Sequence, residues 1–200
     1  AVPVTASYII CAVIAAPALI KLGVPDFAAH MFIFYYAVLS EVSPPTALSP
    51  FAAAAITGGS PYLTTLQSWK YTMPAFLVPF VFVLDSQGIG LLMKVPPGGT
   101  WFDIVEIFLE SAAGIAMLAF AAQGWLFKKN TVLETVLFAI AGLFLVFPAV
   151  LSPTIKLLTG LSIEGFVPLL SDMGVRIGLN VVLGLIVLVT GVVMQRMRPA

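Results

Sequence analysis

Long apolar stretches fill most of the chain, and short groups of glycine, proline and polar residues separate them. The first apolar run extends from Tyr8 to Leu22 and stops at a Gly-Val-Pro-Asp sequence, a good helix C-terminal signal. A helix needs about 20 residues to cross a bilayer, so this shorter run favours one arm of a re-entrant hairpin over a full span. Thr5 or Ser7 is predicted to cap the helix, and Pro3 suits a helix start.

The second apolar run, from about Phe27 to Thr57, is predicted to be a broken helix. At its centre lies the sequence Ser40-Glu41-Val42-Ser43-Pro44-Pro45-Thr46. Adjacent prolines remove two N–H donors and clash with the preceding turn, and the residue before each proline is driven out of the α region. The joint frees carbonyls at mid-membrane depth, where each unpaired group costs several kcal/mol unless protein, water or an ion satisfies it. We therefore keep two interpretations, a cation site and a plain proline kink.

The positions of the lysines and arginines predict which segment lies opposite the joint. Lysines and arginines favour the cytoplasmic side, which puts Lys128, Lys129, Arg196 and Arg198 inside and the end of the broken helix near Thr57 inside as well. The start of the hairpin arm then lies at mid-depth, facing the joint. Sodium, like other hard cations, prefers oxygen ligands. The predicted cation-binding residues are Thr5, Ser40, Val42, Ser43, Pro45 and Thr46.

Two titratable residues offer an alternative to a neutral-oxygen site. Glu41 lies in the joint, and an intramembrane carboxylate is a functional hypothesis by default, so a proton is the other candidate coupling ion. Glu41 would equally well point into a water-filled vestibule and have little effect. His30 occupies the first turn of the broken helix, where an interfacial structural role is commoner than a ligand role.

The middle of the chain mixes an interfacial helix with a connection. Ser60 and Pro61 are the N-cap and first residue of a helix to Tyr71 whose alternating aromatic and polar residues favour the membrane interface. An apolar segment to Leu84 follows, and together the two are long enough to cross. The glycines and prolines of residues 85–101 predict an exposed connection, and its Gly-x-Gly lacks a preceding strand and a third glycine, so nucleotide binding is rejected.

Three more regular spans are predicted beyond this connection. They cover about Ile104–Phe127, Val132–Val150 and Ile177–Met194, with an interfacial stretch at Pro153–Gly174. The spans carry carboxylates near their ends but no Glu-x-x-His motif, so a paired-carboxylate metal site is not expected. We interpret these carboxylates as membrane-entry residues facing water or a neighbouring helix; they are Glu106, Glu110 and Glu134.

Composition agrees with the all-α, polytopic membrane fold that the apolar runs predict. The 200 residues are 60% hydrophobic and 9% charged, against about 25% charged in soluble domains. Nine basic and nine acidic residues leave no basic patch, and no nucleic-acid partner is expected. Cys11, the single cysteine, excludes an intrachain disulfide and is interpreted as a small core residue. The chain opens without a methionine or a signal pattern, so we expect the C-terminal piece of a longer protein.

Several short motifs resemble one transporter family. They are Pro3-Val4-Thr5-Ala6-Ser7-Tyr8, Ala16-Pro17-Ala18-Leu19, Leu22-Gly23-Val24, Ala29-His30-Met31-Phe32-Ile33-Phe34-Tyr35-Tyr36, Ser43-Pro44-Pro45-Thr46-Ala47 and Val78-Pro79-Phe80-Val81-Phe82-Val83. Residues 1–86 resemble the end of the large membrane subunit of TRAP transporters, of the branch that fuses small and large subunits. Residues 101–200 resemble that branch's extra C-terminal helices more weakly. The family usually has Thr-Pro-Pro where this chain has Ser43, which keeps a hydroxyl, and a glycine often stands where Ser40-Glu41-Val42 lies.

The resemblance implies a fold and a function. It implies an elevator-type transporter of the bacterial inner membrane, multi-pass, in which residues 1–86 end the transport core, residues 87–100 form an external linker and residues 101–200 are accessory helices. It implies a permease, not an enzyme, that takes an organic acid from a periplasmic solute-binding protein and works with the small-permease portion of the same transporter. Uptake would be driven by a sodium or proton gradient, with sodium the expected ion and no other cofactor. The alternatives from other classes are a membrane scaffold or interaction subunit and a channel-like pore.

Overall fold

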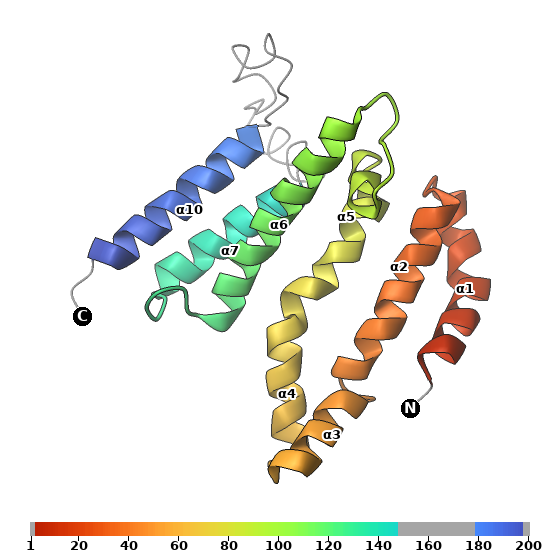
Figure 1. Ribbon diagram of the computed structural model, residues 1–200, viewed down its shortest axis with the longest axis horizontal. Helices are drawn as coiled ribbons and strands as arrows, with labels where there is room; N and C mark the ends of the chain where they lie inside the picture. The colour runs from red at the N-terminus through yellow and green to blue at the C-terminus, as the bar shows by residue number, and fades with distance from the viewer. Residues whose placement is uncertain (1–2, 148–178, 198–200) are drawn as a thin grey trace. The chain divides into compact units, whose positions relative to one another are not determined.

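The computed structural model describes residues 3–147 and 179–197, and every named regular element in these ranges is a helix (Figure 1). The all-α prediction is confirmed for this part of the chain. Two helices, Val4–Lys21 and Trp101–Gln123, are long and apolar enough to cross a membrane. The chain divides into two compact units, Ala1–Pro97 and Gly98–Ala200, and each is described by itself. The predicted interfacial stretch Pro153–Gly174 lies outside the described residues.

The first unit opens with a hairpin of two helices, α1 (Val4–Lys21) and α2 (Asp26–Leu39), which run side by side in Figure 1. Gly23 turns the chain between them with a φ of +93°, a conformation that glycine adopts without steric cost. Pro3 is the N-cap of α1 and no side chain caps the helix, so the predicted caps, Thr5 and Ser7, are wrong. The 18 residues of α1 make a helix about 27 Å long, so the argument for a re-entrant arm from a short run does not hold.

The predicted broken helix is confirmed. After α2 come a 3-10 turn, η1 (Ser40–Val42), a non-helical segment, and a second helix, α3 (Leu48–Thr57). We call the run α2–η1–α3 the first interrupted rod of this unit. A second interrupted rod follows and consists of α4 (Pro61–Thr72), the 3-10 segment η2 (Met73–Leu77) and α5 (Val78–Leu84). Ser60 and Pro61 occupy the predicted N-cap and first position of α4.

The core of the first unit lies at the turn between α1 and α2. Val24, Ala28 and Ala29 pack with Phe82 of α5, and the 3-10 segment η3 (Gln87–Leu92) covers this cluster with Ile89, Leu91 and Leu92. The prediction of an exposed connection over residues 85–101 is therefore wrong for η3. Gly88 is the reason: a Cβ there would collide with the Val81 carbonyl, so only glycine lets η3 lie against the backbone of α5.

The described residues of the second unit form three helices, α6 (Trp101–Gln123), α7 (Val132–Val146) and α10 (Leu179–Met197). Glycines allow close contacts between them: a Cβ at Gly114 of α6 would lie 2.8 Å from Val146 of α7, and one at Gly191 of α10 would lie 2.5 Å from the Phe138 ring. Helices thus lie at the places of the three predicted spans, with shifted ends, and of the three only α6 is by the described residues long and apolar enough to cross a membrane. The part of the second predicted span beyond residue 147 lies outside the described residues.

Polar side chains connect the turn between α6 and α7 to the end of α10. Gln195 of α10 is fully buried and its Oε1 accepts from the Phe127 N–H at 3.1 Å, while its Nε2 donates to Asn130 at 2.6 Å. Asn130 in turn donates to the Phe120 carbonyl at 2.8 Å, so the α6–α7 turn is fastened to α10. Glu134 is buried, and its carboxylate accepts from the Thr131 N–H in a capping box. Of the two surroundings predicted for it, water is therefore excluded, and a neighbouring helix stays a prediction.

Candidate functional site

The joint of the broken helix follows the stereochemistry that its two prolines impose. Ser43, which precedes them, is extended, with φ −115° and ψ 147°, as expected before proline. The Pro44–Pro45 peptide bond is cis. Ala47 then takes a left-handed conformation with φ 41°, and α3 starts at the next residue. The backbone therefore leaves the helical path for residues 43–47.

The hydroxyl groups of the joint donate to its own carbonyls. Ser40 Oγ donates to the Ala37 carbonyl at 2.7 Å, and Ser43 Oγ donates to the Leu39 carbonyl at 3.1 Å. Thr46 Oγ1 reaches back across the break to the Ser40 carbonyl, and its distance to the Ser43 carbonyl is 3.2 Å. The Thr46 side chain thus links the segment after the two prolines to Ser40, the first residue of the 3-10 turn.

Other carbonyls of the joint receive no such donor. The positions three and four residues after Glu41 are the two prolines, which have no N–H, and the position three residues after Val42 is Pro45. In the described part of the chain no hydrogen bond reaches the carbonyls of Val42 or Pro45, whereas those of Ser40 and Ser43 accept Thr46. The predicted ligand carbonyls therefore fall into two groups. Open carbonyls, those of Val42 and Pro45, accept no hydrogen bond from a described residue, and braced carbonyls, those of Ser40 and Ser43, accept one from Thr46.

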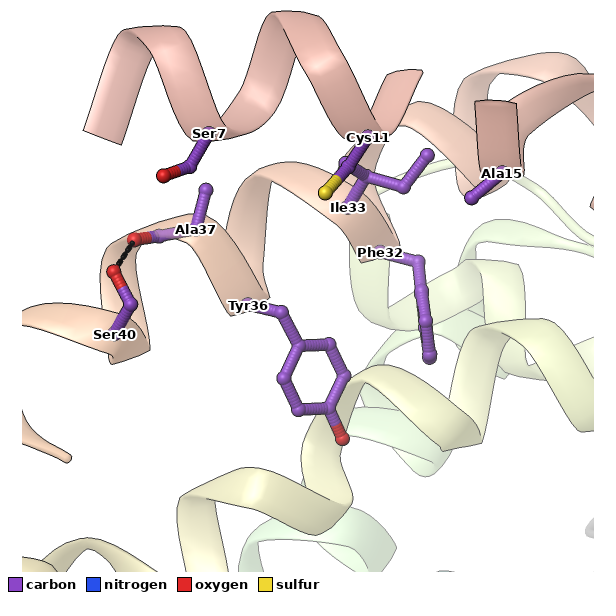
Figure 2. A pocket seen from close by; sticks show the side chains of 8 residues that line it. All are labelled: Ser7, Cys11, Ala15, Phe32, Ile33, Tyr36, Ala37 and Ser40. Carbon is purple, nitrogen blue, oxygen red and sulfur yellow. Dashed lines mark hydrogen bonds between the residues drawn. The ribbon is translucent and has the colours of Figure 1, made fainter. Parts of the chain in front are cut away.

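A cavity of about 340 Å³ lies between α1 and α2 and ends at the joint (Figure 2). Ser7, Cys11 and Ala15 line its α1 wall at a spacing of four residues, and its α2 wall ends at Ser40. The start of α1 therefore lies beside the end of α2. The mid-membrane depth that the charge argument gives to this place stays a prediction. The hydroxyl that α1 contributes is Ser7, because Thr5 is exposed and is not among the lining residues. Cys11 is exposed toward this cavity, so its interpretation as a core residue is wrong.

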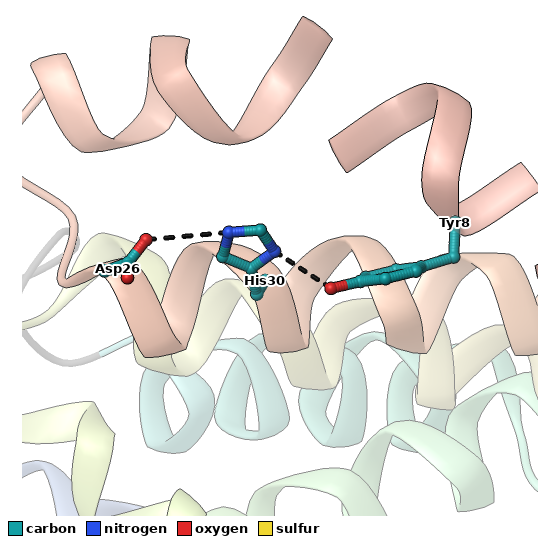
Figure 3. A network of polar contacts seen from close by, with 3 residues as sticks. All are labelled: Tyr8, Asp26 and His30. Atoms are coloured by element: carbon teal, nitrogen blue, oxygen red, sulfur yellow. Dashed lines mark hydrogen bonds and ion pairs between the residues drawn. The ribbon is translucent and has the colours of Figure 1, made fainter. Parts of the chain in front are cut away.

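Three polar residues join the hairpin helices at the other end of α2 (Figure 3). The Tyr8 hydroxyl of α1 lies 2.9 Å from His30 Nδ1, and His30 Nε2 lies 3.5 Å from Asp26 Oδ1. A neutral imidazole with its proton on Nε2 satisfies both contacts, since Nδ1 then accepts the tyrosine proton. His30 is half-exposed, so its described contacts agree with the structural role expected from sequence.

The joint offers oxygen atoms, and no described basic side chain forms an ion pair with them. Glu41 is half-exposed, and no described basic side chain forms an ion pair with it. Carbonyl and hydroxyl oxygens suit a hard monovalent cation, whereas a proton carrier needs a titratable group. Sequence reasoning did not predict that Ser7 lines the cavity. The helix is apolar on every side, so only the four-residue spacing of Ser7, Cys11 and Ala15 would have indicated it.

Comparison with known families places the joint within a recognised module. Residues 1–89 match the family described as "Tripartite ATP-independent periplasmic transporter, DctM component". The match includes both interrupted rods of the first unit and ends within η3. No curated protein and no solved structure is similar enough to count as a match.

Proposed function

Residues 1–89 belong to the DctM family, the large component of tripartite ATP-independent periplasmic (TRAP) transporters, and we propose that the chain forms part of a cation-coupled permease that imports an organic acid. Membership of this family makes the protein a membrane transporter component of bacteria. Transporters of the family work with a periplasmic binding protein and a small permease component. That the small component is fused to this chain, and that the membrane is the inner one, are parts of the proposal.

The broken helix is the observation that carries the proposal. A helix that crosses lipid keeps its carbonyls paired, so open carbonyls next to a break need a ligand, water or another protein group. Secondary transporters use unwound backbone of this kind to coordinate sodium. The Val42 and Pro45 carbonyls, beside the hydroxyls of Ser43 and Thr46, support a sodium site at residues 40–46. Thr5 stays a prediction, and Ser7 is the α1 hydroxyl nearer the cavity.

Reconstituted transport tests the proposal. The complete transporter that contains this chain is placed in proteoliposomes, and uptake of radiolabelled dicarboxylates, keto acids and sialic acid is measured with its binding protein. We expect accumulation only when an inward sodium gradient and the binding protein are both present. A proton gradient that replaces sodium fully would move the coupling to a titratable group such as Glu41.

The same experiment separates the alternative classes. A channel-like pore would pass solute down its gradient without the binding protein and without regard to the cation. A scaffold subunit would leave uptake dependent on other chains, so disruption of the joint would lower abundance without changing sodium dependence. Either result contradicts the proposed function.

A further inference from the structure

One hydrogen bond connects the two interrupted rods of the first unit. The Tyr36 hydroxyl of α2 donates to the Phe76 carbonyl of η2 at 2.5 Å, across 40 residues of sequence. In Figure 2 the Tyr36 ring points away from α1, so its hydroxyl extends to the far side of α2 from Ser7 and Cys11. The side chain is half-buried.

A proline removes one local donor of the Phe76 carbonyl. In a 3-10 segment this carbonyl would accept from the N–H three residues later, and that residue is Pro79, which has none. No described backbone N–H outside a helix's own ladder bonds to it. In lipid surroundings an unpaired carbonyl costs several kcal/mol, so the Tyr36 hydroxyl supplies what the proline removed.

Aromatic packing fixes the direction of this contact. The Tyr36 ring centroid lies 4.9 Å from that of Phe32 and 6.1 Å from those of Phe76 and Phe80. Phe32 and Phe80 meet edge to face at 5.3 Å, an arrangement that aromatic pairs prefer. The hydroxyl is therefore held at the Phe76 carbonyl by rings on both rods.

Tyr36 lies one helical turn before the joint. The backbone N–H groups where α2 ends bond back to the carbonyls of Tyr36 and Val38, and Ser40, four residues after Tyr36, receives the Thr46 hydroxyl. A shift of Tyr36 relative to η2 would therefore move the residues that present the open carbonyls. The hydrogen bond sets the position of the joint against the second rod.

We propose that Tyr36 is a positioning residue for the cation site: its hydroxyl, bound to the Phe76 carbonyl, holds the joint in the geometry that binds sodium. This inference rests on the proposed function. It adds a partner for the joint, the 3-10 segment η2, and a reason for Pro79, which keeps the Phe76 carbonyl open for an interhelical donor rather than a local one.

The test compares conservative tyrosine variants in the complete transporter, with the sodium concentration for half-maximal uptake as the readout. Tyr36→Phe keeps the ring and removes the donor, and we expect about a fivefold rise in that concentration, in line with the loss of one hydrogen bond. Tyr35→Phe is the matched neighbour, also half-buried, and Tyr8→Phe removes a different interhelical bond, the one to His30. Both should stay within about twofold of the wild type, and all three should dock the binding protein normally.

A second substitution makes the test sharper. Pro79→Ala restores an N–H three residues after Phe76, so in this background Tyr36→Phe should have a smaller effect than in the wild type. A wild-type sodium curve for Tyr36→Phe, or an equal shift for Tyr8→Phe, would overturn the inference. If Tyr36→Phe alone does not accumulate, recovery of protein and sodium dependence in the double variant supports the inference, and no recovery overturns it.

Failure of the inference and failure of the proposed function look different. If the wild type needs sodium and Tyr36→Phe does not alter that need, the inference alone fails. If the wild type takes up solute without dependence on a sodium or a proton gradient, the proposed function fails and the inference fails with it. Dependence on a proton gradient alone overturns the inference and leaves a cation-coupled permease.

Discussion

Replacing Thr46 with valine tests the joint most directly. Valine has nearly the same shape as threonine but no hydroxyl, so the Ser40 carbonyl loses the donor that crosses the break, and the contact to the Ser43 carbonyl disappears. The Ser40 carbonyl keeps only a long contact, at 3.5 Å, with the Ser43 N–H, and an acceptor left with so weak a partner costs about 1 to 3 kcal/mol. Thr46 is half-buried, so we take the lower part of this range, about 1 to 2 kcal/mol.

This cost converts into a measurable change in sodium affinity. A difference of 1.4 kcal/mol is a factor of ten, so the sodium concentration for half-maximal uptake should rise about 5- to 30-fold in Thr46→Val. Uptake by the reconstituted transporter is measured over a range of sodium concentrations at a fixed, saturating level of loaded binding protein. Thr46→Ser, which keeps a hydroxyl, should return the curve to within about threefold of the wild type.

A matched control excludes a general effect of losing threonine hydroxyls. Thr57 ends α3, and its Oγ1 donates at 3.0 Å to the Ala53 carbonyl within the same helix, so Thr57→Val removes a hydroxyl without touching the joint. Its sodium curve should match the wild type. Equal curves for Thr46→Val and the wild type, with normal abundance of both proteins, would refute the claim that the joint binds the coupling cation.

Three further predictions concern the rest of the chain. Glu41→Gln should leave sodium dependence largely intact in the uptake assay, because the site is built from neutral oxygens; abolished uptake would instead indicate a proton. Gln195→Leu should lower the melting temperature of the purified protein, since three hydrogen bonds at the end of the second unit are lost at about 1 kcal/mol each, whereas Gln123→Leu on the half-exposed end of α6 should not. Deletion of residues 101–200 should reduce abundance on immunoblots more than it changes ion dependence, as expected if the second compact unit is accessory; normal abundance with altered ion stoichiometry would contradict this.

Proline chemistry made the joint predictable from sequence alone. The two prolines remove donors at fixed positions, and no tertiary contact can restore an N–H that the ring lacks, so the break at residues 43–47 follows from local stereochemistry. The same reasoning marks Pro79, but its consequence, the Tyr36 contact, depends on which residue packs beside it. The chemistry of a break is local, whereas its partner is set by the fold.

Residues whose roles depend on packing were not predictable in the same way. Gly88 lies in a glycine-rich segment that is typical of a linker, and its actual role, a close approach to the α5 backbone, leaves no mark in the sequence pattern. Nothing in the sequence signals that Gln195, close to the end of the chain, is fully buried among the described residues of the second unit. On α1 every face is apolar, so periodicity does not separate Ser7, which lines the cavity, from the exposed Thr5.

The hydrogen bonds of the joint indicate different roles for its hydroxyl and carbonyl oxygens. A hydroxyl donates one proton and keeps lone pairs that still accept, so Thr46 can brace the Ser40 carbonyl and offer its oxygen to a cation at once. The Val42 and Pro45 carbonyls have no such second role, because the described residues provide no hydrogen-bond donor for them. We therefore expect the carbonyls to supply most of the attraction for sodium and the hydroxyls to hold the spacing. On this reasoning Ser43→Ala, whose hydroxyl braces only the Leu39 carbonyl of the preceding turn, should weaken sodium affinity less than Thr46→Val, which releases the two sides of the break from each other.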